Sequence, residues 1–241
     1  MQFNVSQREI TLKVVYYGPP FSGKTTNLQA LHGSLLPGAR GRLTVLNTAD
    51  DRTLFFDLLP VVVASRSGYR IKLKLFTVPG QVIHAATRRV VLAGADGVIF
   101  VADSQLSEAR RNNEFWHGMR HYMTKTGINP NTVPTVIQLN KRDLPDIRSD
   151  EEVAQLQKKS REPLYLAAAV RNEGVRETLH GLLQLLFDKL NTKHHFQAKF
   201  QISADEFSAA LFGDAGVGES PSSAPPSPAP PSGHDQPRAP R

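Results

Sequence analysis

The stretch from Gly18 to Thr25, Gly-Pro-Pro-Phe-Ser-Gly-Lys-Thr, limits the possible folds of this chain more than any other. It matches the pattern G-x-x-x-x-G-K-[ST], a phosphate-binding loop that needs a strand before it and a helix after it. Residues 10–17 form an apolar, β-branched and aromatic run that is typical of a buried strand, and residues 24–34 favour a helix. Because both flanks are present, a chance Gly/Pro turn is the poorer explanation.

This loop predicts a set of contacts to phosphate oxygens. Backbone N–H groups from Phe21 onward can point at an anion near the helix N-terminus, where the helix dipole favours negative charge. Lys24 adds a positive charge toward the β- and γ-phosphates, and the Thr25 hydroxyl is a ligand for the Mg²⁺ of a nucleoside triphosphate. The predicted phosphate-binding residues are Gly18, Phe21, Ser22, Gly23, Lys24, Thr25, Thr26 and, from a later loop, Gly80.

Composition excludes several other kinds of protein. The 241 residues are 40% hydrophobic and 21% charged, which is ordinary for a globular chain with one large core. The absence of cysteine excludes disulfides, thiolate metal sites and a cysteine nucleophile. No stretch resembles a signal peptide or a membrane span, so we expect a cytoplasmic protein. The net charge of +7 comes from scattered residues without a nucleic-acid motif, so we expect no nucleic-acid partner.

Strand-like and helix-like segments alternate along most of the chain. Predicted strands are 10–18, 55–64, 69–77, 97–102, 135–140 and 164–169; predicted helices are 24–34, 106–125, a short helix opened by a capping box at 149–152, and 175–190. The second and third strands predict an antiparallel hairpin, in which Lys72 and Lys74 suit a sheet edge. Repeated strand–helix crossovers predict an α/β fold with a doubly wound, mostly parallel sheet.

The same reading divides the chain into three regions: a nucleotide-binding domain over 1–190, a helical extension over 191–213 and a tail over 214–241. Phe and Leu side chains in the extension predict either a packed helix or a partner-docking element. Ser, Pro, Ala and Gly dominate the tail, which predicts a disordered or polyproline-like segment with nothing to bury.

A second motif, Asn-Lys-Arg-Asp at 140–143, follows a buried strand and predicts guanine recognition. The Asp143 carboxylate can accept from guanine N1–H and the exocyclic amine, the Asn140 amide can reach N7, and the Lys141 stem can lie along the base. Adenine has no N1–H and would leave this carboxylate unpaired. A later loop, at Ala168 and Ala169, is expected to offer a backbone N–H to guanine O6.

Two loops are expected to approach the γ-phosphate. In Thr-Val-Pro-Gly-Gln at 77–81, Gly80 can bring its N–H to the γ-phosphate and Gln81 can orient the attacking water. In the connection over 35–54, Thr53 offers a hydroxyl to Mg²⁺ and Arg52 offers a guanidinium to the transition-state charge. The respective alternatives are a plain Pro-Gly turn and a plain surface loop.

Together these residues resemble the Ras-like small GTPases and, more narrowly, the bacterial mutual gliding protein (MglA) group. The resemblance spans roughly residues 5 to 190. The specific matches are Val15-Tyr16-Tyr17-Gly18-Pro19, Gly23-Lys24-Thr25-Thr26-Asn27-Leu28, Asp51-Arg52-Thr53-Leu54-Phe55-Phe56-Asp57, Thr77-Val78-Pro79-Gly80-Gln81-Val82, Asp96-Gly97-Val98, Val101-Ala102-Asp103-Ser104-Gln105 and Gln138-Leu139-Asn140-Lys141-Arg142-Asp143-Leu144-Pro145.

The resemblance implies a Ras-like G domain that binds GTP and GDP with Mg²⁺ and hydrolyses GTP slowly. It implies two switch regions near 37–57 and 78–90, with Thr53 as a Mg²⁺ ligand, Arg52 as a built-in arginine finger and Gln81 as the water-orienting residue. The implied partners are a homodimeric roadblock-type activating protein (MglB-like) and polarity, cytoskeletal or motility effectors. Recruitment to a cell pole or to a peripheral membrane site is left open.

Two residues depart from this pattern. Thr77 stands where most Ras-like proteins carry Asp, although the MglA group shares the Thr, and an uncharged side chain should weaken the support of Mg²⁺. Pro20 stands where the group has Gly; it has no N–H and places a ring near the attacking water, which concerns the hydrolysis rate and not nucleotide binding.

Two functional hypotheses follow from these observations. The first is a regulatory GTPase in bacterial cell polarity and in gliding or twitching motility. The second is a GTP-gated scaffold with negligible turnover of its own. A phosphate-loop ATPase or kinase is disfavoured by Asn140 and Asp143, because these residues predict a guanine site.

Overall fold

The computed structural model describes residues 1–46, 56–78 and 85–213, and these residues form an eight-stranded sheet. The strand order is β3 (Thr44–Leu46), β4 (Phe56–Ala64), β5 (Arg70–Thr77), β2 (Glu9–Tyr17), β6 (Gly97–Asp103), β7 (Thr135–Asn140) and β8 (Leu164–Leu166), and β1 (Gln2–Asn4) pairs with β2. Neighbouring strands from β5 to β8 are parallel, whereas β4 is antiparallel to β5. The predicted α/β fold with a mostly parallel sheet is therefore confirmed.

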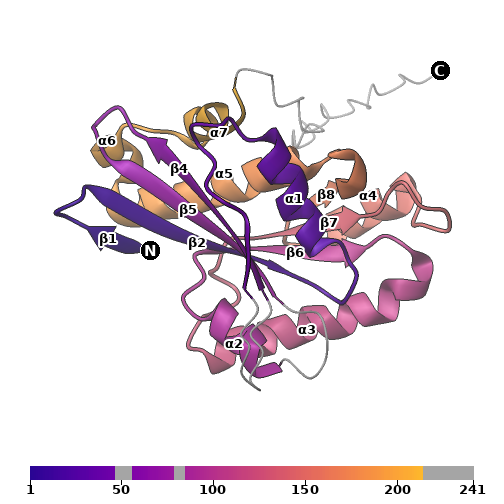
Figure 1. The fold of residues 1–241 in the computed structure, drawn as a ribbon. Helices are drawn as coiled ribbons and strands as arrows, with labels where there is room; N and C mark the ends of the chain where they lie inside the picture. The colour runs from indigo at the N-terminus through magenta and orange to yellow at the C-terminus, as the bar shows by residue number, and fades with distance from the viewer. Residues whose placement is uncertain (47–55, 79–84, 214–241) are drawn as a thin grey trace, which may run out of the picture.

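Helices cover both faces of this sheet (Figure 1). On one face lie α1 (Lys24–Ser34), α5 (Val175–His194), α6 (Phe196–Phe200) and α7 (Ala204–Phe212). On the other face lie α2 (Ala85–Leu92), α3 (Ala109–Lys125) and α4 (Asp150–Lys159). Short 3-10 turns, η2 (Leu106–Glu108) and η3 (Ala169–Arg171), precede α3 and α5. β6 is buried along its whole length because helices lie on both of its sides, which explains its uninterrupted apolar sequence.

The structure corrects several expectations about the strands. β3 lies inside the connection predicted over 35–54, and β1 was not predicted; strands of three residues are too short to show an alternating pattern. β8 is shorter than expected, because the chain turns at Ala167 toward η3. β5 is not an edge strand, since it lies between β4 and β2. Its half-buried Lys72 approaches Glu9 on β2, at 3.8 Å.

The C-terminal extension packs against the rest of the chain. Phe196, Phe207 and Leu211 are fully buried and belong to the same apolar core as the strands beneath α1 and α5. Of the two alternatives that the sequence left open for this region, the structure has the packed helices. The domain boundary near residue 190 stays a prediction, and the tail over 214–241 lies outside the described residues. Among the residues described, no helix is both long and apolar enough to cross a membrane.

Candidate functional site

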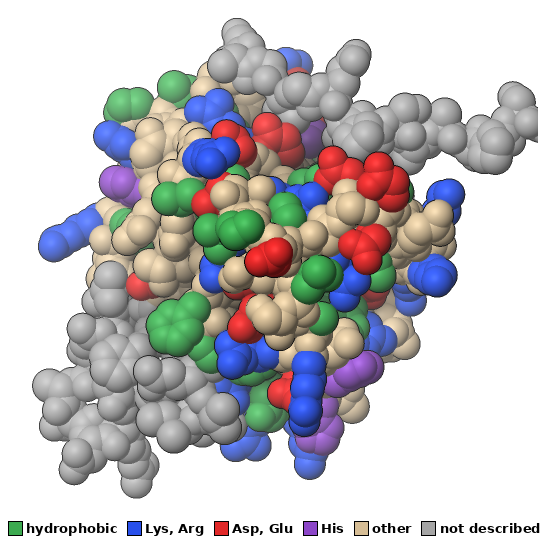
Figure 2. Space-filling view, turned by 90° about the vertical axis from the view of Figure 1, so that its right-hand side faces the viewer, with side chains coloured by type: hydrophobic (Ala, Val, Ile, Leu, Met, Phe, Trp, Pro, Cys, Tyr) green, Lys and Arg blue, Asp and Glu red, His purple; other side chains and the backbone are tan. Residues whose placement is uncertain are grey.

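The predicted phosphate loop, guanine motif and third loop meet at the end of the sheet to which β2, β6 and β7 run. The crevice beyond the carboxyl ends of parallel strands is the usual ligand site of a doubly wound sheet. Figure 2 looks at the molecule from this side, where acidic, basic and hydrophobic side chains are interspersed over the part that the structure describes. This mixture agrees with the scattered charge in the sequence.

Two glycines of the phosphate loop are required by close contacts. A Cβ on Gly18 would lie 2.1 Å from the carbonyl oxygen of Val101 on β6. Gly23 has a φ of 94°, and a Cβ there would lie 2.2 Å from Nδ2 of Asn140. Phe21 also adopts a positive φ, 62°, and its side chain is 84% exposed. The loop can therefore take this path only with glycine at both positions.

Lys24 is buried inside this loop. Its Nζ donates to the carbonyl oxygens of Gly18, at 3.0 Å, and Pro19, at 2.6 Å. Burial, helped by the nearby positive charge of Arg88 and opposed by the Asp57 carboxylate, lowers the pKa of Lys24 to about 7. A buried cation whose hydrogen bonds among the described residues all go to carbonyl oxygens is suited to receive an anion.

We expect nucleotide affinity to fall as pH rises above about 7. The pKa of Lys24 in the folded protein lies below its ordinary value of 10.5. The free-energy cost of burying the charged ammonium is therefore largest below pH 7 and declines as the pH rises toward 10.5, because the folded protein loses this proton first. Bound phosphates favour the charged form, so binding takes up a proton in this window. The GDP dissociation constant should rise by up to about tenfold per pH unit. Calorimetry in two buffers of different ionisation enthalpy measures the proton uptake directly, and a pH-independent affinity without proton uptake would contradict the assignment.

Asp57 is a site residue that the sequence reasoning missed. Its Oδ2 accepts hydrogen bonds from Thr25 Oγ1 at 2.6 Å and from Thr77 Oγ1 at 3.0 Å, and its N–H donates to Thr77 Oγ1 at 2.8 Å. The antiparallel register of β4 and β5 brings Asp57 beside Thr77, at the start of α1. A lone carboxylate near the start of an apolar strand was the available signal. Hydroxyl and carboxylate oxygens are ligands that Mg²⁺ accepts, so the residues present here fit this ion.

The side chain of Asn140 joins three loops. Its Nδ2 donates to the carbonyl oxygen of Ser22 at 2.8 Å, and its Oδ1 accepts from the N–H of Ala169 at 3.0 Å. The amide nitrogen carries a second hydrogen, which can still be donated to a base. Asn140 is almost fully buried, so its removal would leave these backbone groups without partners.

A buried polar network fixes the start of α1 against the guanine loops. Asn27 Nδ2 donates to the carbonyl of Gly23 at 3.0 Å, and Gln138 Nε2 donates to Asn27 Oδ1 at 2.9 Å and to Thr178 Oγ1 at 3.0 Å. Thr178 donates in turn to the carbonyl of Gly174. A glutamine within the apolar strand β7 was the signal in the sequence. The network therefore fixes the distance between the phosphate loop and the base-binding loops.

The other predicted guanine-site residues lie around this joint. Lys141 Nζ forms an ion pair with Asp103 Oδ2 at 2.6 Å, and Lys141 adopts a φ of 68°. Among the described residues, the half-buried carboxylate of Asp143 forms no hydrogen bond or ion pair, so it can accept from a base. The Ala168 N–H donates to the Glu173 carbonyl at 3.1 Å. As the Ala169 N–H is held by Asn140, donation from either alanine to guanine O6 stays a prediction.

Of the remaining predicted residues, one is described and four lie outside the described ranges. Thr26 lies in the first turn of α1 and is half-buried. Gly80, Gln81, Arg52 and Thr53 all lie outside the described residues. Within the residues that are described, no group of three or more His, Cys, Asp or Glu side chains could hold a metal ion.

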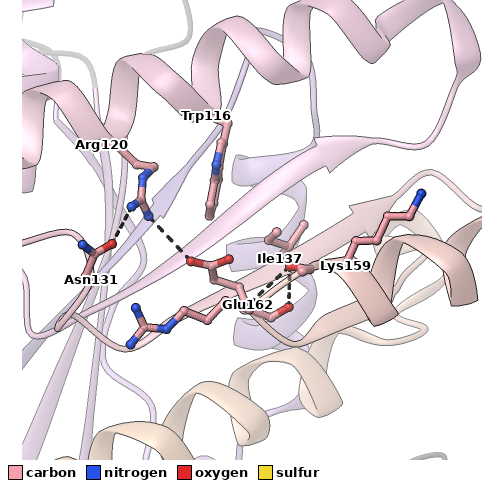
Figure 3. Close-up of a pocket in the computed structure, with 8 residues that line it drawn as sticks. Trp116, Arg120, Asn131, Ile137, Lys159 and Glu162 are labelled. Atoms are coloured by element: carbon pink, nitrogen blue, oxygen red, sulfur yellow. Dashed lines mark hydrogen bonds and ion pairs between the residues drawn. The ribbon is translucent and has the colours of Figure 1, made fainter.

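A hollow of about 390 Å³ lies away from this site, between α3 and the α4–β8 loop (Figure 3). Arg120 lies 5.9 Å from the ring centre of Trp116, donates to Asn131 Oδ1 at 2.6 Å and approaches Glu162 at 3.6 Å. Lys159 points away from these side chains (Figure 3). The polar groups in the hollow mostly pair with one another, so they connect α3 to the start of β8.

Comparison with known proteins identifies the family of the chain. No family model matches the chain. The mutual gliding-motility protein MglA of Myxococcus xanthus (strain DK1622) is 42% identical over 187 residues, which cover 78% of this chain and 96% of that protein. An identity this high over nearly the whole length of the relative shows that the two proteins belong to one family. Members of this family bind GTP and GDP and hydrolyse GTP. The chain belongs to the MglA group of Ras-like small GTPases.

Proposed function

We propose that this GTPase is a nucleotide-dependent switch in bacterial cell polarity and in gliding or twitching motility. Its similarity to a gliding-motility protein over 78% of the chain supports this role. The observation that carries the proposal is the joint at Asn140, because one buried side chain holds the phosphate loop and the third loop at a fixed spacing. The phosphates and the base of one nucleotide would then be bound together.

The guanine base would be held by Asn140, Lys141 and Asp143, with Ala168 and Ala169 at the third loop. The Asp143 carboxylate is the specificity-determining group, since it needs two donors on one edge of the base. The phosphates would lie over the N–H groups from Phe21 to Thr26, with Lys24 leaving its carbonyl partners to contact them. Gly18 allows the turn and Gly80 would approach the γ-phosphate.

Thr25 and Thr53 would hold Mg²⁺, with Asp57 supporting the ion through its contact with Thr25. When bound, Mg²⁺ neutralises charge on the β- and γ-phosphates. Asp57 supplies the carboxylate that Thr77 lacks, from the neighbouring strand β4 instead of β5. The expected weakness of metal support at Thr77 is offset in this way. This contact argues against the alternative of a scaffold with negligible turnover.

For hydrolysis, Gln81 would orient the attacking water and Arg52 would stabilise the transition-state charge. Both belong to the expected switch regions, so a partner that orders these regions would raise the rate. A roadblock-type activating protein is the partner we propose, with polarity, cytoskeletal or motility effectors binding the GTP form. We further propose that the protein works in the cytoplasm and is recruited to a cell pole or a peripheral membrane site.

The base preference provides a direct test. Asp143→Asn should weaken binding of GDP and shift preference toward xanthine nucleotides, because xanthine replaces the exocyclic amine with a carbonyl. The loss for GDP should be on the order of 2 to 3 kcal/mol, as for hydrogen bonds to a charged group. Fluorescent GDP, XDP and ADP competition measures it, and Asp146→Asn, an exposed residue of the same loop, is the control. Equal competition by ADP and GDP in the wild type would contradict the guanine site.

The cellular role needs a separate experiment. Affinity capture with the protein loaded with GTP or with GDP should recover different partners, and GTP-specific partners should belong to the polarity or motility machinery. Single-turnover GTP hydrolysis with and without a roadblock-type protein then tests regulation. If capture is the same in both states and no such protein accelerates hydrolysis, the switch proposal fails.

A further inference from the structure

The helices α6 and α7 (196–212), here called the C-terminal brace, follow the part of the chain that resembles the MglA group. The α7 helix begins with a complete capping box, in which Ser203 and Glu206 satisfy each other's backbone N–H groups. Its inner face carries Phe207, which is fully buried. Ser208 lies 2.8 Å from His180 Nδ1 on α5, so the brace is also held by a buried hydrogen bond. A segment with this much specific packing has a defined position.

The brace contacts both connections that flank the β3–β4 hairpin. At one end, the carbonyl of Leu211 accepts a hydrogen bond from the N–H of Leu36, at 2.8 Å, where the chain leaves α1 toward β3. At the other end, the carbonyl of Phe200 accepts from Ser67 Oγ at 2.9 Å, in the β4–β5 turn. Arg66 in the same turn forms an ion pair with Glu206 at 2.6 Å. The brace therefore fixes the segments on either side of β4.

A continuous set of hydrogen bonds leads from Leu36 to β4. After Leu36 the chain runs along the outer edge of β4, where Gly41 N–H donates to the Pro60 carbonyl at 2.8 Å and Val62 N–H donates to the Ala39 carbonyl at 2.9 Å. A Cβ on Gly41 would lie 2.7 Å from Pro60 Cγ, so these two chains approach closely. The outer edge of β4 thus depends on a segment whose start is held by α7.

The inner face of β4 also belongs to the core of the brace. Leu59, Val61 and Val63 are buried in the same apolar cluster as Phe207 and Leu211. Asp57 lies on this face, two residues before Leu59, and reaches Thr25 from there. A strand that slips by one residue moves every side chain to the opposite face. Contacts that hold the register of β4 therefore also hold Asp57 beside Thr25.

We propose that the C-terminal brace is a positioning element for the nucleotide site, which holds β4 so that the Asp57 carboxylate stays on the Thr25 hydroxyl. This inference rests on the proposed role of Asp57 in supporting Mg²⁺. The brace makes polar contacts with residues that are not assigned to the nucleotide, namely Leu36, Arg66, Ser67 and His180. Loosening it should free β4, raise the Mg²⁺ concentration that is needed to retain GDP and leave guanine recognition unchanged.

The test compares Leu211→Ala with Met123→Ala in the full chain loaded with GDP. Both side chains are 1% exposed or less, but Met123 belongs to the core on the opposite face of the sheet. In Leu211→Ala, amide hydrogen exchange over residues 57–63 should quicken by about tenfold relative to exchange in β6 and β7. GDP dissociation is slow when the protein is saturated with Mg²⁺. The Mg²⁺ concentration needed to reach that slow rate should be about tenfold higher in Leu211→Ala than in the wild type. Leu211→Met, which keeps the volume, should restore both values.

The control should lower overall stability without selective exchange in β4 or a changed Mg²⁺ requirement. Leu211→Val, which removes one methylene group, serves if Leu211→Ala does not fold. If hydrogen exchange in β4 is unchanged in Leu211→Ala, the proposed role of the brace is wrong. It is also wrong if exchange in β4 is faster but the Mg²⁺ requirement is unchanged, provided that Asp57→Asn does change that requirement. If Asp57→Asn has no effect on the Mg²⁺ requirement, the role of Asp57 fails, and exchange in β4 alone decides whether the brace holds the strand.

Discussion

Replacing Arg52 by alanine should lower the partner-stimulated rate of GTP hydrolysis by about 10³- to 10⁵-fold, which is the range typical of an arginine finger. The guanidinium is expected to neutralise charge that develops on the phosphoryl oxygens only in the transition state. GTP and GDP affinity should therefore stay nearly unchanged. The measurement is single-turnover hydrolysis with a saturating roadblock-type partner.

Two comparisons make this result specific. Arg42→Ala removes an exposed arginine from the same connection and should leave the stimulated rate intact. Gln81→Leu should abolish the stimulated rate by a different route, since the water is no longer oriented. Wild-type speed in Arg52→Ala would mean that the partner supplies its own arginine or that Arg52 is a surface residue. Pro20→Gly should change the rate without changing GDP binding.

The second large effect is expected at Lys24. Lys24→Ala should weaken GDP and GTP binding by about 2 to 4 kcal/mol, roughly 30- to 1000-fold, because a charge-assisted contact is lost from a buried site. The protein should still fold, since among the described residues Lys24 donates only to loop carbonyls and the burial of its charge lowers its pKa. Equilibrium titration with a fluorescent GDP measures the loss.

A matched control for this variant is Arg89→Ala, which removes an exposed cation from α2. It should leave affinity within the range expected of a surface substitution. Thermal unfolding of nucleotide-free Lys24→Ala should show unchanged or slightly higher stability. An unchanged nucleotide affinity in this variant would contradict the assignment of the phosphate loop.

The sequence by itself determined the fold class and contained the two motifs that predict a guanine nucleotide as ligand, the phosphate loop over 18–25 and the Asn-Lys-Arg-Asp motif over 140–143. The phosphate-loop pattern of Gly18, Gly23 and Lys24 could be recognised from its local spacing and flanks, and the apolar runs of β6 and β7 need only burial on both faces. The helix over Lys24–Ser34 and the capping box at Ser149 were predicted for the same reason, since caps and periodicity are local properties. Short strands such as β3 were not predicted, because three residues carry no periodic signal.

Only the tertiary structure decided which carboxylate lies beside Thr25. Seen along the chain, Thr77 lacks the expected charge; in space, the antiparallel pairing of β4 with β5 brings Asp57 to the same point. The same applies to Asn140, whose amide links loops that are far apart in sequence, and to the buried Phe207 in the C-terminal brace. Strand register and helix docking depend on long-range contacts, and no local pattern in the sequence encodes them.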